Sequence, residues 1–502
     1  MKIKIKTTKA LTCSAILFTL IFAVFFSACG NSKEGSEIYC YDSYYEEEYW
    51  LDEPSESYLE INENREKYTE DEDTITFSLK VDTAAYTNVT RFIGNGQLPP
   101  SDAVRTEELI NYFNYDKKLE FGDDPFAVYT EIGPSPLNKD KKMAFIRVKT
   151  EEIKKEDLPP SNLTFLIDTS GSMSSYDKLP LLKTALTLLV ETLDAKDTVS
   201  IVTYAGSSAV LLDSVRGNDK STVMSAIRRL ESGGSTAGAD GIKTAYKLAE
   251  RNYIENGNNR VILASDGDFN VGISSLDGLK ALISEKRESG VYLSVLGFGT
   301  GNLRDDVMET LAASGNGNYS YIDSAKTAKK VLVEEMGTNL FTVADDVKAQ
   351  VVFNPKTVKS YRLIGYENRK MNNEDFDNEK KDAGEIGAGT DIVVMFELEM
   401  ESERAAGDIF DVNIRYKTPG GSESCLMTQK ADSAVMTENP SSDFNFACSV
   451  AAFGELLRNS KYARDVGIDD VLDLARNNLG QDKGGYRSDF IDLLKSYRRI
   501  AD

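Results

Sequence analysis

Between residues 161 and 342, short apolar stretches alternate with segments in which apolar residues recur every three or four positions. The apolar stretches predict buried strands, and the periodic segments predict amphipathic helices. This alternation is typical of an α/β domain with a doubly wound, mostly parallel sheet covered on both faces. The expected strands are 163–167, 198–204, 260–264, 291–297 and 319–322, and the expected helices are 179–193, 223–230, 239–253, 276–288, 303–313 and 325–340.

The pattern changes on both sides of this domain. Residues 75–160 predict an N-terminal β-rich segment that ends at the Pro159-Pro160 pair. Residues 343–502 predict a β-sandwich-like region followed by a C-terminal helical segment. We expect the apolar face of that segment to pack on the β-rich or the α/β domain rather than to reach a membrane. The residues of this face are Phe446, Val450, Phe453, Leu456 and Leu457.

Residues 1–28 have the organisation of a secretory signal peptide. Four lysines without an acid precede a long apolar run, and small residues follow it. A transmembrane anchor is the alternative, because the run is nearly long enough to span a bilayer. The small residues before Cys29 resemble the lipobox of a bacterial lipoprotein, which implies that Cys29 is lipidated. We therefore expect a lipoprotein of the cell envelope, anchored in a membrane and facing outside the cytoplasm.

Residues 29–74 are rich in tyrosine and acidic residues and show no apolar period. This composition predicts a disordered tether whose charges repel one another. A binding stripe of tyrosines is the alternative to a solvated spacer.

The composition of the whole chain excludes several functions. Its 502 residues are enough for two or three domains. Histidine is absent, which excludes His-dependent catalytic triads, HExxH zinc proteases and histidine metal ligands. The net charge of −23 argues against nucleic acid as a partner. With Cys13 removed and Cys29 lipidated, three cysteines remain, and Cys425 with Cys448 is the favoured but unforced pair.

Polar side chains gather where the predicted strands of the α/β domain end. Asp168, Ser170 and Ser172 follow the first strand, and Asp266 follows the strand near 260–264. Thr236 lies in a Gly-Gly-Ser-Thr loop that can reach the same edge. The carboxyl edge of an open α/β sheet is where ligands bind, so these side chains are expected to converge there. The alternative is a helix cap formed by the two serines beside a turn aspartate.

All of these groups offer oxygen, which Mg²⁺ and Mn²⁺ prefer. Neutral hydroxyl groups leave a divalent cation under-neutralised, so the site should favour an acidic oxygen from a partner.

Three segments together, DTSGSM, GGSTAGADGI and SDGDFNVG, resemble the von Willebrand factor type A domain with its metal-ion-dependent adhesion site (MIDAS). The resemblance covers about residues 161–340. It implies that Ser170, Ser172 and Thr236 bind the metal directly, and that Asp168 and Asp266 act mostly through water. The expected ion is Mg²⁺, with Mn²⁺ or Ca²⁺ as alternatives.

The flanks resemble bacterial lipoproteins that insert this domain between an N-terminal segment and a C-terminal domain. Together these features predict a non-enzymatic, lipid-anchored binding protein. Its metal site would capture an acidic group of a partner protein. One alternative is an envelope scaffold in which the metal only stabilises the fold, and another is a metal-dependent hydrolase. Hydrolysis is disfavoured because Ser170 has no histidine base and Asp168 has no second acid two residues on.

Overall fold

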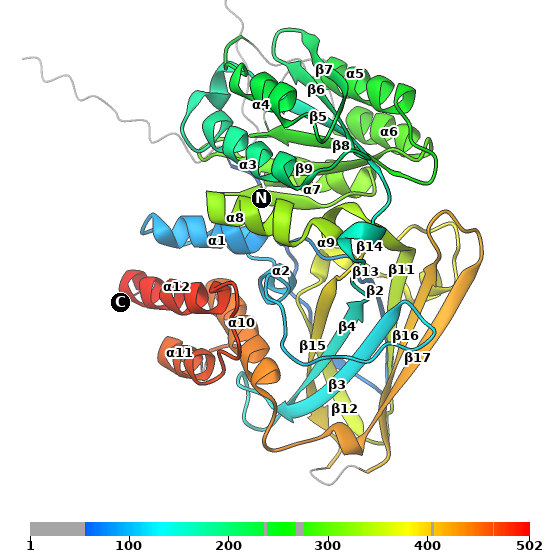
Figure 1. Ribbon diagram of the computed structural model, residues 1–502. Coiled ribbons are helices and arrows are strands. Elements are labelled where there is room, and N and C mark those ends of the chain that lie inside the picture. The colour runs from blue at the N-terminus through cyan, green and yellow to red at the C-terminus, as the bar shows by residue number, and fades with distance from the viewer. Residues whose placement is uncertain (1–55, 235–237, 268–275, 403–405, 465, 502) are drawn as a thin grey trace, which may run out of the picture. The chain divides into compact units, whose positions relative to one another are not determined.

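The computed structural model of the chain describes residues 56–501 except 235–237, 268–275, 403–405 and 465 (Figure 1). The predicted signal peptide, Cys29, Cys40, tether residues 29–55 and Thr236 lie outside the described residues. The described residues belong to one compact unit, Glu53–Asp502. Among them, no helix combines the length and the apolar character needed to cross a membrane.

The α/β domain is built on a six-stranded sheet with β5 in its interior. Its strands in spatial order are β10 (Tyr319–Ile322), β9 (Tyr292–Phe298), β8 (Asn258–Ser265), β5 (Ser161–Asp168), β6 (Thr198–Tyr204) and β7 (Ser208–Arg216). All neighbouring strands pair in parallel except β7, which is an antiparallel edge strand. This confirms the predicted doubly wound, mostly parallel sheet, whereas the sequence pattern did not predict β7.

Helices cover both faces of this sheet (Figure 1). One face carries α3 (Leu179–Thr192), α4 (Lys220–Arg228) and α8 (Ala325–Lys329), and the other carries α5 (Gly238–Arg251), α6 (Leu276–Arg287) and α7 (Asp305–Ser314). Successive side chains of β5 point to opposite faces, so Phe165 and Ile167 join one core and Leu166 joins the other. The helix expected over 325–340 is interrupted, because a π-helical turn η4 (Lys330–Glu334) separates α8 from α9 (Met336–Leu340).

Two antiparallel sheets form a β-sandwich beside the α/β domain. The first contains β1 (Lys67–Tyr68), β12 (Val358–Ile364), β15 (Asp391–Met400), β4 (Lys142–Thr150) and β3 (Phe126–Pro134). The second contains β13 (Lys370–Met371), β2 (Thr74–Ser78), β11 (Thr342–Phe353), β16 (Asp408–Lys417) and β17 (Ser424–Asp432), with β14 (Ile386–Gly387) paired to β11. Short 3₁₀ turns are η1 (Ser101–Ala103), η2 (Lys155–Asp157), η3 (Gly171–Ser174), η5 (Glu367–Arg369), η6 (Asn373–Phe376) and η7 (Ser433–Val435).

The sandwich is shared by the regions before and after the α/β domain. β2 pairs with β11, and β4 pairs with β15, so each sheet takes strands from both regions. The sequence analysis treated residues 75–160 and 343–502 as separate regions. Neither region forms a sandwich by itself. If the two regions were separated, β2 and β11, and β4 and β15, would lose each other as partners and expose unpaired backbone groups. The inserted domain therefore interrupts one continuous β-structure.

The prediction of a disordered tether is wrong for residues 56–74. β1 pairs with β12, and the buried Asn64 donates hydrogen bonds to the carbonyl oxygens of Leu363 and Gly365, the latter at 2.6 Å. Glu56 forms an ion pair with Arg91, with 2.8 Å between Oε2 and Nη2. Local composition suggested repulsion between acids, but partners distant in sequence neutralise and hold this segment.

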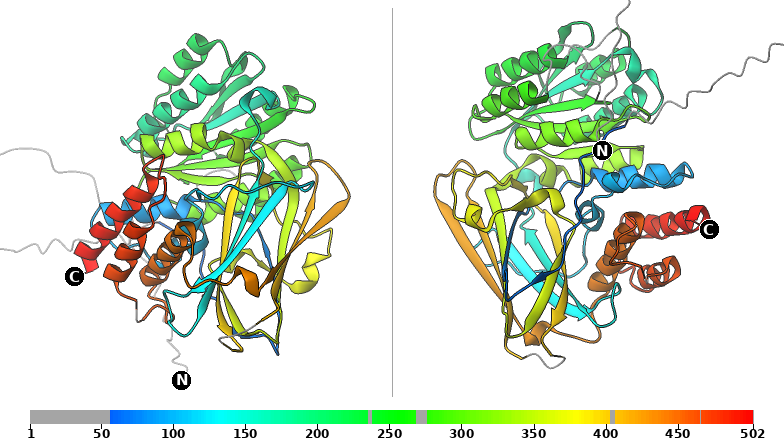
Figure 2. Two further views of the ribbon diagram at one scale, coloured as in Figure 1. Left: turned by 60° about the horizontal axis from the view of Figure 1, so that its bottom comes forward. Right: turned by 180° about the vertical axis from the view of Figure 1, so that it is seen from behind.

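The C-terminal helices pack on the sandwich, as expected. α10 (Ser442–Leu457), α11 (Ile468–Asn477) and α12 (Tyr486–Ala501) share a core with α1 (Ala84–Gly94) and α2 (Thr106–Ile110). Residues from β4 and β15, including Phe145 and Val393, belong to the same core. In Figure 2, α12 lies beside α1, and the contacts between the two helices agree with this view.

The favoured disulfide is not formed. Cys425 on β17 and Cys448 in α10 are both free. Cys448 is buried in the helical core, whereas Cys425 packs against the core of the sandwich. The two cysteines therefore belong to different layers of the protein.

Phe490 offers a test of how far the helical layer contributes to stability. Its ring is fully buried and lies 5.6 Å from the ring of Phe113 and 5.7 Å from that of Phe446, measured between centroids. We expect Phe490→Ala to lower the free energy of unfolding by about 3–5 kcal/mol, because it leaves a cavity in a packed core. Urea unfolding followed by circular dichroism measures this change. Tyr176→Ala, at a position 87% exposed, is the matched control, and equal midpoints for both variants would contradict the prediction.

Candidate functional site

The predicted metal-site residues lie at the carboxyl edge of the α/β sheet. Asp168 is the last residue of β5, and Asp266 follows the last residue of the neighbouring strand β8. Ser170 precedes the 3₁₀ turn η3, and Ser172 lies within it. Because β5 and β8 are adjacent and parallel, their ends bring the two aspartates to one place.

The loop that leads to Thr236 lies against the same site. The backbone N–H of Gly233 donates to the carbonyl oxygen of Thr169 at 2.8 Å, and Gly171 donates to Gly234 at 3.1 Å. These bonds hold the two glycines of the Gly-Gly-Ser-Thr segment beside the loop that follows Asp168. Thr236 itself lies outside the described residues, so its role as a ligand stays a prediction.

Asp168 is fully buried, and its carboxylate accepts three hydrogen bonds. Its Oδ1 accepts the backbone N–H of Ser170 at 2.9 Å, and its Oδ2 accepts the hydroxyl groups of Ser265 at 2.9 Å and Tyr204 at 3.2 Å. Burial raises the pKa of Asp168, and the nearby negative charge of Asp266 adds to this effect. Ionisation of Asp168 therefore costs more free energy in the folded protein than in water.

Hydroxyl groups lie beside the two aspartates. The Oγ atoms of Ser170 and Ser172 are 3.0 Å apart, and the Ser172 side chain is among the groups that lower the pKa of Asp266. Ser170 is buried and Ser172 is exposed, so this pair of hydroxyl groups runs from the interior to the surface. The structure thus brings together four of the predicted site residues, Asp168, Ser170, Ser172 and Asp266.

Two further residues, which the sequence analysis did not identify, bind Asp266. Lys178 Nζ donates to Asp266 Oδ2 at 2.9 Å, and Asn302 Nδ2 donates to the same oxygen at 3.0 Å. Burial alone would raise the pKa of Asp266, but these bonds and the charge of Lys178 hold it below its usual value. Asn302 follows β9, which is adjacent and parallel to β8, so the position of its loop at this sheet edge was a usable signal. Lys178 precedes α3, and its sequence position gave no such signal.

The donor set fits a divalent cation of the Mg²⁺ type. Two carboxylates and two hydroxyl groups supply oxygen atoms at one sheet edge. The hydrogen-bond donors to Asp168 are the Ser170 backbone N–H and the hydroxyl groups of Tyr204 and Ser265, all of which are uncharged. In the part of the chain that the structure describes, no group of three or more His, Cys, Asp or Glu side chains is arranged to hold a metal. The hydroxyl groups of Ser170 and Ser172 are the neutral oxygen donors that the described residues offer beside these two aspartates.

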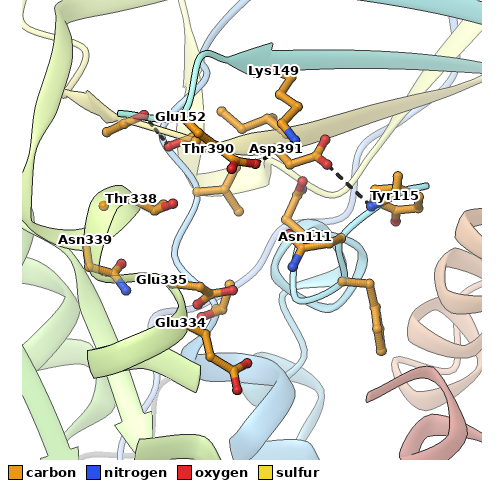
Figure 3. Close-up of a pocket in the computed structure, with 18 of the residues that line it drawn as sticks. Asn111, Tyr115, Lys149, Glu152, Glu334, Glu335, Thr338, Asn339, Thr390 and Asp391 are labelled. Carbon is orange, nitrogen blue, oxygen red and sulfur yellow. Dashed lines mark hydrogen bonds and ion pairs between the residues drawn. The ribbon is translucent and has the colours of Figure 1, made fainter. Parts of the chain in front are cut away.

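A cavity of about 600 Å³ lies elsewhere, where the α/β domain, the sandwich and the helices meet (Figure 3). Figure 3 shows Glu335 and Asp391 among the side chains that line it. Asp391 is paired with Arg147 at 2.7 Å, and Glu335 is paired with Lys330. Its lining does not include the predicted metal-site residues. This cavity is thus distinct from the metal site, and these two carboxylates are already partnered.

The sheet topology and the grouping of these residues define a von Willebrand factor type A domain. Residues 162–334 match the family model of that domain, and residues 52–144 match a model described as von Willebrand factor. Residues 338–500 match a model described as uncharacterized protein YfbK, C-terminal. The YfbK protein of Escherichia coli (strain K12) is 41% identical over 470 residues, which cover 89% of this chain and 81% of that protein. The chain belongs to the YfbK family of type A domain proteins.

More distant relatives share parts of the chain. Inter-alpha-trypsin inhibitor heavy chain H3 of Homo sapiens is 26% identical over 264 residues, covering 49% of this chain and 29% of that protein. A von Willebrand factor type A structure from Catenulispora acidiphila covers 74% of this chain and 91% of its own, with 15% identity and a TM-score of 0.43. Type A domains are in general non-catalytic modules of protein–protein interaction, and many bind a divalent metal.

The raised pKa of Asp168 predicts a pH-dependent effect on stability. A carboxyl group whose pKa is raised on folding stabilises the fold while protonated, and that contribution is lost as the pH rises through the folded pKa. We therefore expect Asp168→Asn to raise the melting temperature of the metal-free protein at pH 7, and the difference from wild type to shrink as the pH falls. Thermal unfolding in chelator at several pH values measures this.

The exposed Asp140 provides the control for this measurement. Asp140→Asn removes the same charge from a surface turn and should leave the melting temperature nearly unchanged. A metal-free Asp168→Asn protein that is less stable than wild type at pH 7 would contradict the prediction.

Proposed function

We propose that this protein is a non-enzymatic binding protein that uses a divalent metal at a MIDAS to capture an acidic group of a partner protein. The observation that carries the proposal is the convergence of two buried carboxylates, Asp168 and Asp266, and the paired hydroxyl groups of Ser170 and Ser172 at one edge of the sheet. Among the residues that the structure describes, Asp168 and Asp266 are the two carboxylates that would neutralise a cation bound there. Mg²⁺ is the favoured ion, because it accepts oxygen ligands in an octahedron and usually keeps open or water-filled positions.

The exposure of the site supports capture of a partner rather than a purely structural role. Ser172 is exposed, and the neighbouring Tyr176 is 87% exposed on the same loop. A carboxylate from another protein can therefore approach the site at the hydroxyl group of Ser172. A metal that only stabilised the fold, as in the scaffold alternative, would not need an exposed ligand.

The groups around the site also favour binding over hydrolysis. The side-chain amine of Lys178 is bonded to Asp266 and Asn302, so it is not free to act as a base. Ser170 contacts Asp168 and Ser172, and neither arrangement activates a serine nucleophile as a histidine does.

We further propose that Cys29 carries a lipid that anchors the protein in a membrane of the cell envelope, facing outside the cytoplasm. The basic start, the apolar run and the small residues before Cys29 support this proposal. Lipid anchoring would keep a binding protein at the membrane without a spanning helix.

Metal titration tests the proposed site. We expect Asp168→Ala, Ser170→Ala and Thr236→Ala each to weaken Mg²⁺ binding by about 10–100-fold while the protein stays folded, because each removes an oxygen that binds or orients the cation. The effect of Asp168→Ala should be largest, since it also removes a negative charge. Calorimetric titration with Mg²⁺ and Mn²⁺ measures this, and circular dichroism checks folding.

Ser221→Ala is a matched control for this series. The Ser221 residue is exposed on α4, and its hydroxyl donates to Asp219, which lies outside the predicted site. If folded Asp168→Ala binds Mg²⁺ as tightly as wild type, the site is misassigned. Mg²⁺ binding without any chelator-sensitive binding of carboxylate ligands would favour the scaffold alternative.

The anchor is tested separately. Cys29→Ser should abolish the incorporation of labelled fatty acid and release the protein from membranes, because the lipid rather than a spanning helix would hold it. Metabolic labelling and membrane fractionation measure these two effects. A wild-type protein that incorporates no fatty acid would show that the anchor proposal is wrong.

A further inference from the structure

We infer that Lys178 is a fixed positive charge of the metal site that weakens cation binding and strengthens the hold of the loaded site on a carboxylate. The inference rests on the proposed function and names a residue that tunes it. Lys178 is 6% exposed, and its amine lies on one of the two carboxylates of the site.

The bonds of Lys178 place its charge at Asp266 and not at the protein surface. Nζ donates to Asp266 Oδ2 at 2.9 Å and to Asn302 Oδ1 at 2.8 Å. Asn302 donates in turn to the same carboxylate oxygen at 3.0 Å. The three side chains form a closed set of hydrogen bonds, which fixes both the amine and the carboxylate.

The aliphatic part of Lys178 is also fixed. Gly299 has a φ of 81°, in the region that favours glycine, and a Cβ atom added there would collide with Cε and Cγ of Lys178. The absence of a side chain at Gly299 lets the lysine pass beneath this loop. This packing and the two hydrogen bonds of the amine hold the lysine in a buried position, so we expect its charge to stay at the site when a cation binds.

The charges of the site determine how strongly it would bind a cation and then an anion. Among the described groups of the site, ionised Asp168 and Asp266 contribute two negative charges, and Lys178 neutralises one of them. A divalent cation would bring the net charge of these three groups to about +1, whereas the two carboxylates alone would leave the loaded site neutral. The charge of Lys178 lies 2.9 Å from the Asp266 carboxylate, and charges this close in a buried site interact strongly. The lysine thus repels the cation but leaves the loaded site with a positive charge that attracts an anion.

Neutral variants of Lys178 test this inference, because charge and structure predict opposite results. We expect Lys178→Met to bind Mg²⁺ about tenfold more tightly than wild type, and the Mg²⁺-loaded variant to bind acetate about tenfold more weakly. Lys178→Gln, which keeps a hydrogen-bond donor but no charge, should change both affinities in the same directions. Calorimetric titration with Mg²⁺, and then with acetate as the carboxylate probe, measures the two affinities on the full mature chain.

The exposed Lys247 on α5 provides the matched control, and Lys247→Met should leave both affinities unchanged. If Lys178 served only to position Asp266, both neutral variants would bind Mg²⁺ less tightly than wild type, and the inference would be overturned. Unchanged Mg²⁺ or acetate binding in both variants would overturn it as well. Wild-type protein that binds no Mg²⁺ would instead refute the proposed function itself, so the two failures are distinguishable.

Discussion

A buried arginine links the α/β domain to the regions that flank it. Arg105, 2% exposed, donates from Nη1 to Asp305 at the start of α7 and from Nε to Glu108 in α2, both at 2.6 Å. Burial raises the pKa of Glu108, and the charge of the Arg105 guanidinium opposes this effect. Removal of one partner from such a buried pair costs about 3–5 kcal/mol, because a charge is left uncompensated. The inserted domain is therefore tied to its surroundings by more than its two chain connections.

The same loop that leads to this ion pair also reaches the metal site. Asn302 bonds to Asp266, and Asp305, three residues later, bonds to Arg105. Between them, the carbonyl oxygen of Leu303 accepts the backbone N–H of Ser57 at 3.1 Å, so a residue of the segment predicted to be a disordered tether holds this loop. The segment from Asn302 to Asp305 is thus held at both ends, by Asp266 at one end and by Arg105 at the other. The predicted metal site and the interface around Arg105 consequently share one backbone segment.

Local sequence patterns predicted the part of the site that follows strands and failed for the part that depends on distant contacts. Asp168 follows a strand that is apolar in its interior, so its place at the sheet edge followed from the pattern alone. Lys178 and Asn302 meet Asp266 only after folding, and no spacing in the chain relates all three. The sandwich was divided wrongly for a similar reason, because β2 and β11 are separated in sequence by the whole α/β domain. β7 was missed because it is a largely solvent-facing edge strand, which lacks the apolar signal of a buried one.

The two aspartates of the site differ in a way that assigns them different roles. Hydrogen bonds from Asn302 and Lys178 lower the pKa of Asp266 against the effect of burial, so its negative charge is already compensated by the protein. Burial raises the pKa of Asp168, whose recorded partners are neutral donors. A cation therefore has most to gain electrostatically at Asp168, while Asp266 contributes fixed geometry more than free charge. Because the hydroxyl groups of Ser170 and Ser172 lie 3.0 Å apart in the loop that follows Asp168, a cation near Asp168 would lie among oxygen atoms that are in place before it binds.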